Sequence, residues 1–195
     1  MSDAMRQWAR LADADHLRRT LIDASAFLVA YASLTDFCVR STHGLLSKPG
    51  SAIASLGEAE ALLSRGDPEQ LLARCDPDRP TAPVVRAAIQ FFVEGGAFSA
   101  EDVARLERLT ARRDEIVARM HLLLAEDPAG ELLGATLEIR DLLRSASRWW
   151  FLEVEAAIAP ELLRGQDSEA ARPVGGTELI LDFVLRVAQN AAEPG

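Results

Sequence analysis

Residues 99–125 read SAEDVARLERLTARRDEIVARMHLLLA and form the clearest helical pattern in the chain. Ser99 followed by Asp102 matches the capping-box pattern that begins many helices, and the Asp-Pro pair at 127 ends the segment. Between these points apolar side chains recur at steps of three and four residues, as on one face of an amphipathic helix. The stretch therefore predicts one long helix with an apolar face.

Similar patterns cover most of the remaining chain. Turn residues concentrate between 47 and 82, and Pro83, Gly95 with Gly96, and Pro160 are positioned to begin or end helices. No segment alternates with the period of two that a half-buried strand requires. We predict an all-α bundle of long antiparallel helices in a single domain, residues 1–195, with a short N-terminal extension at 1–12 and helices over 13–46, 55–64, 68–74, 83–94, 99–125, 131–158 and 178–192.

Composition limits the class of protein. The 195 residues are 49% hydrophobic and carry a net charge of -9, which excludes a uniformly basic nucleic-acid or membrane binder. All basic residues except Lys48 are arginine, so any basic cluster would bind anions through planar guanidinium groups. Cys38 and Cys75 are too few for a disulfide framework or a zinc site, and we expect both to be reduced and structural, with no metal or cofactor. We expect a cytoplasmic protein that does not bind membranes, because the N-terminus lacks an apolar signal region.

Arg113 occupies an unexpected position in the helix predicted at 99–125. When residues are placed at steps of 100°, five apolar side chains fall within about 40° of Arg113: Leu106, Leu109, Val117, Met120 and Leu124. A guanidinium group buried there would need a carboxylate, a ligand anion or an acceptor from a second subunit. Glu153 lies near the centre of the apolar face of the 131–158 helix, so we predict a structural Arg113–Glu153 ion pair as one interpretation.

Residues 106–121, LERLTARRDEIVARMH, resemble the RNase motif helix of HEPN domains, in which four to six residues separate an arginine from a histidine. The segments 21–31, 91–102 and 148–155 extend this similarity to HEPN-like bacterial proteins over roughly residues 17–161. The resemblance implies a helical bundle that forms a homodimer, with the motif helices of two subunits facing a shared cleft. It also implies metal-independent RNA cleavage and a role of the phage-defence or toxin–antitoxin type.

The resemblance assigns candidate catalytic roles to Arg113, Asp114 and His121. Arg113 matches the motif arginine, and Asp114 stands where the motif often has asparagine. The expected histidine positions hold Ala118, Arg119 and Met120, and His121 lies one residue beyond the widest spacing. Arginine can hold a phosphate group but cannot exchange protons near neutral pH as imidazole does. Either His121 has taken over through a local change in helix geometry, or the site has lost catalysis and keeps a binding or structural role, which we favour.

Arginine side chains also form two rows that could bind RNA or another anion. One row follows the helix at 99–125 and the other follows the next helix, and the candidate binding residues are Arg112, Arg119, Arg144 and Arg148. Glu101, Glu115 and Glu155 lie near these rows, so we favour solvated, salt-bridged faces. The aromatic run at 149–151 could stack a base, but we expect it in the core or at a subunit interface.

Two hypotheses follow for the function. The first is a HEPN-like protein with a degenerate RNase site that binds RNA or nucleotide without efficient cleavage. The second is a non-enzymatic helical dimerisation or interaction protein, with a protein partner and with Arg113 neutralised by Glu153. A transcription regulator is less expected, because the chain shows no compact helix-turn-helix with a basic recognition helix.

Overall fold

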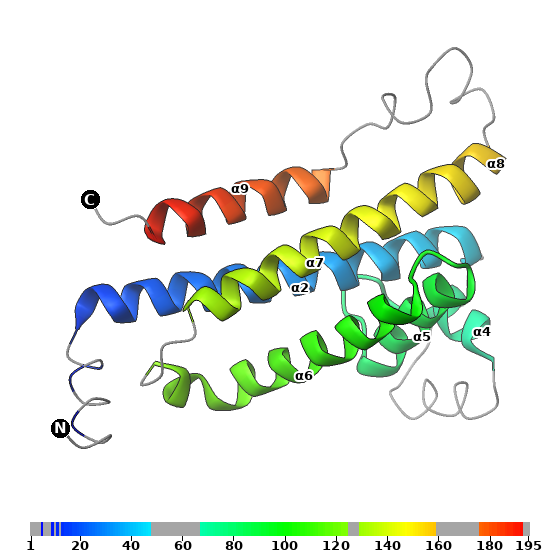
Figure 1. The fold of residues 1–195 in the computed structure, drawn as a ribbon. Coiled ribbons are helices and arrows are strands. Elements are labelled where there is room, and N and C mark those ends of the chain that lie inside the picture. The colour runs from blue at the N-terminus through cyan, green and yellow to red at the C-terminus, as the bar shows by residue number, and fades with distance from the viewer. Residues whose placement is uncertain are drawn as a thin grey trace, which may run out of the picture. The chain divides into compact units, whose positions relative to one another are not determined.

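The computed structural model describes residues 13–47, 67–124, 129–158 and 176–192, together with Met5, Ala9 and Leu11. No strand occurs among them, which confirms the predicted all-α fold (Figure 1). The helix predicted at 55–64 lies outside the described residues. The helices are α2 (Ala14–Leu46), α4 (Pro68–Arg74), α5 (Ala82–Glu94), α6 (Ala100–Leu123), α7 (Ala129–Trp149), α8 (Ala156–Ile158) and α9 (Gly176–Ala192), with a π-helical segment at Trp150–Glu155.

Local sequence signals set several of these boundaries. Pro83 lies in the first turn of α5, as predicted, where its missing N–H would have no partner in the helix. After α5, Gly96 has a φ of 85°, a left-handed conformation that glycine adopts without strain. The helix predicted at 131–158 begins slightly earlier and changes to π-helical geometry at Trp150.

Backbone contacts divide the chain into two compact units, each described by itself below. Unit 1 contains α2 up to Ser33, α6 from Asp102, α7 up to Leu142, and α9. Unit 2 contains the remainder of α2, α4, α5, the remainder of α7, the π-helical segment and α8. The prediction of a single domain is not tested by this division and stays a prediction.

Unit 2 has an aromatic core centred on Phe92. The ring centroid of Phe92 lies 5.3 Å from that of Trp149, 5.7 Å from Trp150 and 5.9 Å from Phe37. Trp150 and Phe151 are buried, so the aromatic run at 149–151 serves packing, as expected. A side chain at Gly95 would collide with the indole ring of Trp149, so this close packing requires glycine at that position.

Unit 1 has an aliphatic core that also holds polar groups. Leu109 and Ile116 of α6, Leu132 of α7, Phe27 of α2 and Leu181 of α9 are all buried. The buried polar side chains of this unit are Thr20, Asp23, Thr136 and Glu178. Thr136 donates a hydrogen bond to the Leu132 carbonyl at 2.7 Å, which satisfies its hydroxyl group within α7.

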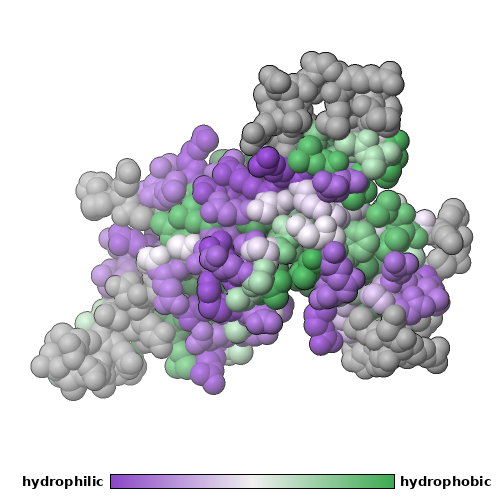
Figure 2. Space-filling view, turned by 45° about the vertical axis from the view of Figure 1, so that its right-hand side comes forward, coloured by the Kyte–Doolittle hydropathy of each residue, from purple (hydrophilic) through white to green (hydrophobic). Residues whose placement is uncertain are grey.

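Helix α2 is long and apolar enough to cross a membrane by length and composition, with a mean hydropathy of 1.4 in its most apolar window. Half of that window is buried inside the protein, and the core helix of a soluble protein meets the same criteria. The cytoplasmic location therefore stays a prediction. Figure 2 shows hydrophobic side chains at the surface among hydrophilic ones.

Both cysteines have structural positions in unit 2. Cys38 and Cys75 are both buried, which fits the expected structural role, and their reduced state stays a prediction. Burial raises the pKa of each thiol above its usual range. Since the thiolate is the reactive form, both groups are held in their inert state.

Candidate functional site

Five of the predicted site residues lie together on α6 in unit 1: Arg112, Arg113, Asp114, Arg119 and His121. The other candidates, Arg144, Arg148 and Glu153, belong to unit 2 and have exposed side chains. The Arg113–Glu153 pair joins different units and stays a prediction.

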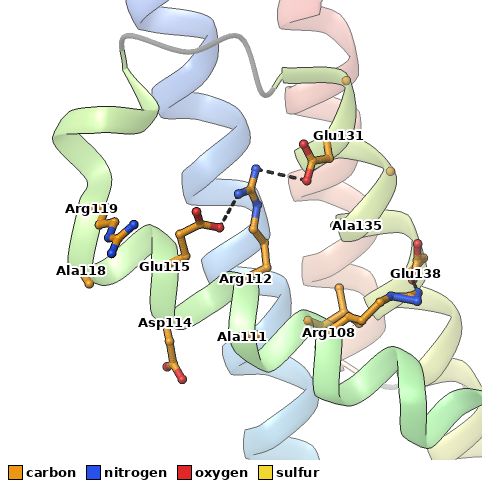
Figure 3. A pocket seen from close by; sticks show the side chains of 13 residues that line it. Arg108, Ala111, Arg112, Asp114, Glu115, Ala118, Arg119, Glu131, Ala135 and Glu138 are labelled. Carbon is orange, nitrogen blue, oxygen red and sulfur yellow. Dashed lines mark hydrogen bonds and ion pairs between the residues drawn. The ribbon is translucent and has the colours of Figure 1, made fainter.

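A pocket of about 830 Å³ lies between α6 and the part of α7 in unit 1 (Figure 3). Arg112, Asp114 and Arg119 line it, whereas Arg113 and His121 do not. Three guanidinium and four carboxylate side chains contribute to its wall: Arg108, Arg112, Arg119, Asp114, Glu115, Glu131 and Glu138. The pocket is therefore not a positively charged cleft.

Carboxylates pair two of the three arginines of this pocket. Arg112 lies between Glu115, at 2.5 Å, and Glu131 of α7, at 3.2 Å, as the dashed lines in Figure 3 show. Arg108 Nη2 lies 3.1 Å from Glu138 Oε2, also on α7. These contacts confirm a salt-bridged face at this part of the arginine row on α6, and they join α6 to α7.

The side chain of Arg112 is 18% exposed, so its ion pairs are partly shielded from water. Its Nε is buried and has no hydrogen-bond partner among the described residues. Glu131 and Glu138 are the partners that the sequence analysis missed. They are seven residues apart and therefore share one face of α7, which is the signal that could have identified them.

Arg113 is not in the middle of the buried face, and that expectation is wrong. Its side chain is 39% exposed, while Val117 in the next turn is 67% exposed. The buried side chains of α6 are Leu106, Leu109, Ile116 and Leu123, whose mean direction lies about 40° from Arg113. Arg113 therefore lies at the edge of the core, where its charge needs no fully buried counterion.

Two neighbours stabilise the charge of Arg113. Its Nε lies 2.8 Å from Asp114 Oδ1, at an angle that does not make a hydrogen bond, and its guanidinium carbon lies 5.1 Å from the ring centroid of Tyr31. This second contact is a cation–π interaction, worth about 0.5–1 kcal/mol at exposed sites. Asp114 therefore pairs with Arg113 rather than only standing in for the motif asparagine.

The position of Tyr31 is fixed from α6. The Thr110 hydroxyl donates to the Leu106 carbonyl at 2.7 Å, so it accepts the hydrogen bond from the Tyr31 hydroxyl at 2.8 Å. The ring of Tyr31 also stacks on Phe27, at 6.4 Å between centroids. These contacts hold the ring against Arg113, and the sequence gives no local signal for them because α2 and α6 are far apart in the chain.

Helix α6 is kinked at Arg119, where the backbone has φ −132° and ψ 29° (Figure 3). The kink lies between Arg113 and His121, so it changes the angle between their side chains from that of a straight helix. His121 nevertheless has an exposed side chain outside the pocket. The lining residues include no imidazole or thiol, so this pocket contains no group that readily exchanges protons near neutral pH.

Among the described residues of unit 1, Asp23 has an altered pKa, and it lies outside the α6 pocket. Burial raises the pKa of Asp23 from 3.8 to about 6, and the positive charge of Arg19 partly opposes this effect. Asp23 is in the core face of α2 and does not line the pocket. The described residues contain no group of three or more His, Cys, Asp or Glu side chains that could hold a metal ion.

In comparisons with protein-family models, curated proteins and solved structures, no match to this chain was found.

Proposed function

We propose that this chain is a HEPN-like helical interaction protein, of the phage-defence or toxin–antitoxin type, whose RNase motif has a structural role and does not cleave RNA. The observation that carries the proposal is the pairing of the motif arginine, Arg113, and of the neighbouring candidate binding residue, Arg112. Arg112 pairs with Glu115 and Glu131, and Arg113 pairs with Asp114 and contacts Tyr31. A phosphate group would have to displace these carboxylates before it could bind either guanidinium group.

The chemistry of RNA cleavage supports the same conclusion. Attack by a 2′-hydroxyl requires a group that removes its proton, and a second group that protonates the leaving oxygen. The pocket offers carboxylates that are paired with arginine, while His121 lies outside it. A carboxylate that already pairs with arginine is not free to approach a 2′-hydroxyl unless that ion pair breaks.

Exposed apolar side chains in unit 1 support an interaction role. Leu179, Ile180 and Phe183 of α9 are each more than half exposed. Large apolar groups at neighbouring surface positions indicate a face that contacts another protein more often than a face that only contacts water. Unit 1 thus has a surface suited to association, and a motif helix on which Arg108, Arg112 and Arg113 are paired with carboxylates.

An RNA cleavage assay with metals removed by chelation tests the proposal. We expect no cleavage by the wild-type protein beyond that in buffer, and the same result for R113A and H121A. Circular dichroism of all three proteins controls for folding. Cleavage by the wild type that both substitutions abolish would overturn the proposal and restore a catalytic interpretation of the motif.

Arg119 favours a second candidate function, which is binding of RNA or nucleotide without cleavage. Its side chain is exposed, lines the pocket and forms no ion pair with the described residues. This function predicts binding of a short single-stranded RNA that weakens with salt and is reduced in R119A. Salt-independent binding, or equal binding by R119A, would reject this second function.

A further inference from the structure

Helix α9 has apolar side chains on two nearly opposite faces. Leu181, Leu185 and Ala188 are buried in the core of unit 1. The other face exposes Leu179, Ile180, Phe183 and Val187, and Phe183 is 66% exposed. Successive residues turn by 100° in a helix, which places the centres of these two faces about 150° apart. A surface helix that only had to pack on its own core would need the first face alone.

The exposed face of α9 borders an apolar groove in unit 1. The groove has a volume of about 350 Å³ and lies between α2 and α9, with Phe183, Val184 and Val187 on one side. On the α2 side, Leu21 and Val29 are large apolar residues with exposed side chains. The exposed face of α9 and this groove form one continuous apolar surface, which we call the α2–α9 surface. Its large exposed side chains are Leu21 and Val29 of α2 and Leu179, Ile180, Phe183 and Val187 of α9.

We propose that the α2–α9 surface binds the same surface of a second copy of this chain, with the two α9 helices antiparallel about a two-fold axis near Val184. The proposal rests on the interaction role proposed above and names its partner. It places the dimer contact on α9 and α2, whereas the HEPN resemblance implies contact through the motif helices. No residue that lines the α6 pocket belongs to the α2–α9 surface.

Charge supports a second copy as the occupant. Asp182 and Arg186 lie on the same edge of the exposed apolar face, four residues apart. In an antiparallel pair, equivalent edges meet across the two-fold axis. An axis level with residue 184 therefore places Asp182 of each copy opposite Arg186 of the other, so one edge of the apolar contact holds two ion pairs between oppositely charged side chains.

The area required by a stable dimer explains why α2 takes part. Stable interfaces bury about 800 Å² on each partner. The exposed face of α9 spans residues 179–187, about 12 Å of helix, which is too short to supply that area alone. Insertion of Phe183 into the groove of the other copy adds Leu21 and Val29 to the contact and covers both exposed sides of the groove.

Size-exclusion chromatography with light scattering tests this dimer on the complete chain. We expect the wild type to be dimeric and F183E to be monomeric at the same concentration. Loss of one anchoring aromatic side chain weakens association about 30-fold, and the two-fold axis counts it twice, so the dissociation constant should rise on the order of 1,000-fold. V117E is the matched control, because Val117 is 67% exposed but lies on α6.

Charge exchange supplies a second test that does not remove apolar contact. D182R and R186D should each weaken the dimer by placing like charges in contact, and D182R/R186D should restore it. A monomeric wild type, a dimer lost in V117E but kept in F183E, or no rescue by the double exchange would each overturn the proposal. The RNA cleavage assay and the dimer measurements are independent. RNA cleavage by the wild type would reject the proposed function, but it would not show which surface the chain uses to dimerise.

Discussion

The two units differ in how completely their buried groups are satisfied. Unit 2 packs rings against rings around Phe92, and its one buried side-chain atom without a hydrogen-bond partner, among the described residues, is Thr81 Oγ1. Unit 1 has several such atoms, including Thr20 Oγ1, Asp23 Oδ1 and Arg112 Nε. Unit 2 resembles a scaffold held by packing, while unit 1 retains polar groups that reduce its stability.

This difference shows where function is to be sought. Buried polar atoms without a protein partner cost roughly 1–3 kcal/mol each, and they are accounted for by a functional role or by a bound water or ion. Unit 1 also contains the charged pocket and the α2–α9 surface. The predictions below test whether polar groups limit the stability of unit 1 and whether packing determines that of unit 2.

We expect the titration of Asp23 to cause the largest change in unfolding free energy. Its pKa is 3.8 in the unfolded chain and about 6 in the fold, so the folded state holds the proton more tightly. As pH rises from below 3.8 to above 6, the unfolded state ionises first, and the protein should lose up to about 3 kcal/mol of unfolding free energy. D23N lacks this titration and should lose less stability over that interval in urea unfolding.

D15N is the matched control for D23N, because Asp15 is an exposed carboxylate on the same helix. D15N retains Asp23, so it should keep the loss of unfolding free energy between pH 3.8 and about 6. If D23N and the wild type have parallel pH profiles, the carboxylate of Asp23 is not the group that limits unit 1.

We expect the second-largest change in unfolding free energy from substitution of Gly95 in unit 2. In G95A the new methyl group would meet the indole ring of Trp149, and overpacking of this type costs about 2 kcal/mol. G44A is the matched control: Gly44 lies in α2, also in unit 2, with no atom near its added methyl group. Alanine is the better helix former, so G44A should gain about 0.5–1 kcal/mol. Thermal unfolding of G95A at the wild-type temperature would show that packing at Trp149 is not tight.

Helices and their ends were readable from the sequence because they depend on neighbouring residues. Pro83 at the start of α5 and Gly96 after its end act through their own backbones. The π-helical segment at Trp150–Glu155 was not predicted, since the apolar spacing around Trp150 is compatible with an α-helix. Such a bulge depends on how the aromatic rings pack, which no local pattern encodes.

The site was less predictable because its partners come from other helices. The apolar positions of α6 placed Arg113 at the centre of the buried face, although the face actually covered by the rest of unit 1 is centred elsewhere. Tyr31 and Glu131, which contact Arg113 and Arg112, come from α2 and α7. Periodicity identifies which residues share a face, but it does not identify what covers that face.

Charge reversal at Arg112 should produce a smaller loss than the changes at Asp23 and Gly95. R112E places a third carboxylate beside Glu115 and Glu131, at a site that is partly shielded from water. We expect urea unfolding to show a loss of about 1.5 kcal/mol, between the values for surface and buried ion pairs. R119E, an exposed change on the same helix, should lose less than about 0.5 kcal/mol. Equal losses in both variants would mean that the ion pairs between α6 and α7 contribute little.

The smallest energies that we predict are the coupling energies of Arg113 with its two neighbours, Tyr31 and Asp114. A double-mutant cycle of R113M with Y31L should give a coupling energy of about 0.5–1 kcal/mol from the cation–π contact. The cycle of R113M with D114A should give a smaller value, about 0.2–0.5 kcal/mol, because exposed ion pairs are weak.

These two cycles also bear on function. If Arg113 stabilises the fold, R113M should lower the unfolding free energy of the protein and leave its affinity for RNA unchanged. If Arg113 serves a binding site, R113M should lower the RNA affinity of the protein, and the coupling energy between Arg113 and Tyr31 should be near zero. R113M measured in both assays therefore decides between them, and coupling to Tyr31 that exceeds the coupling to Asp114 would place the motif arginine in the architecture of unit 1.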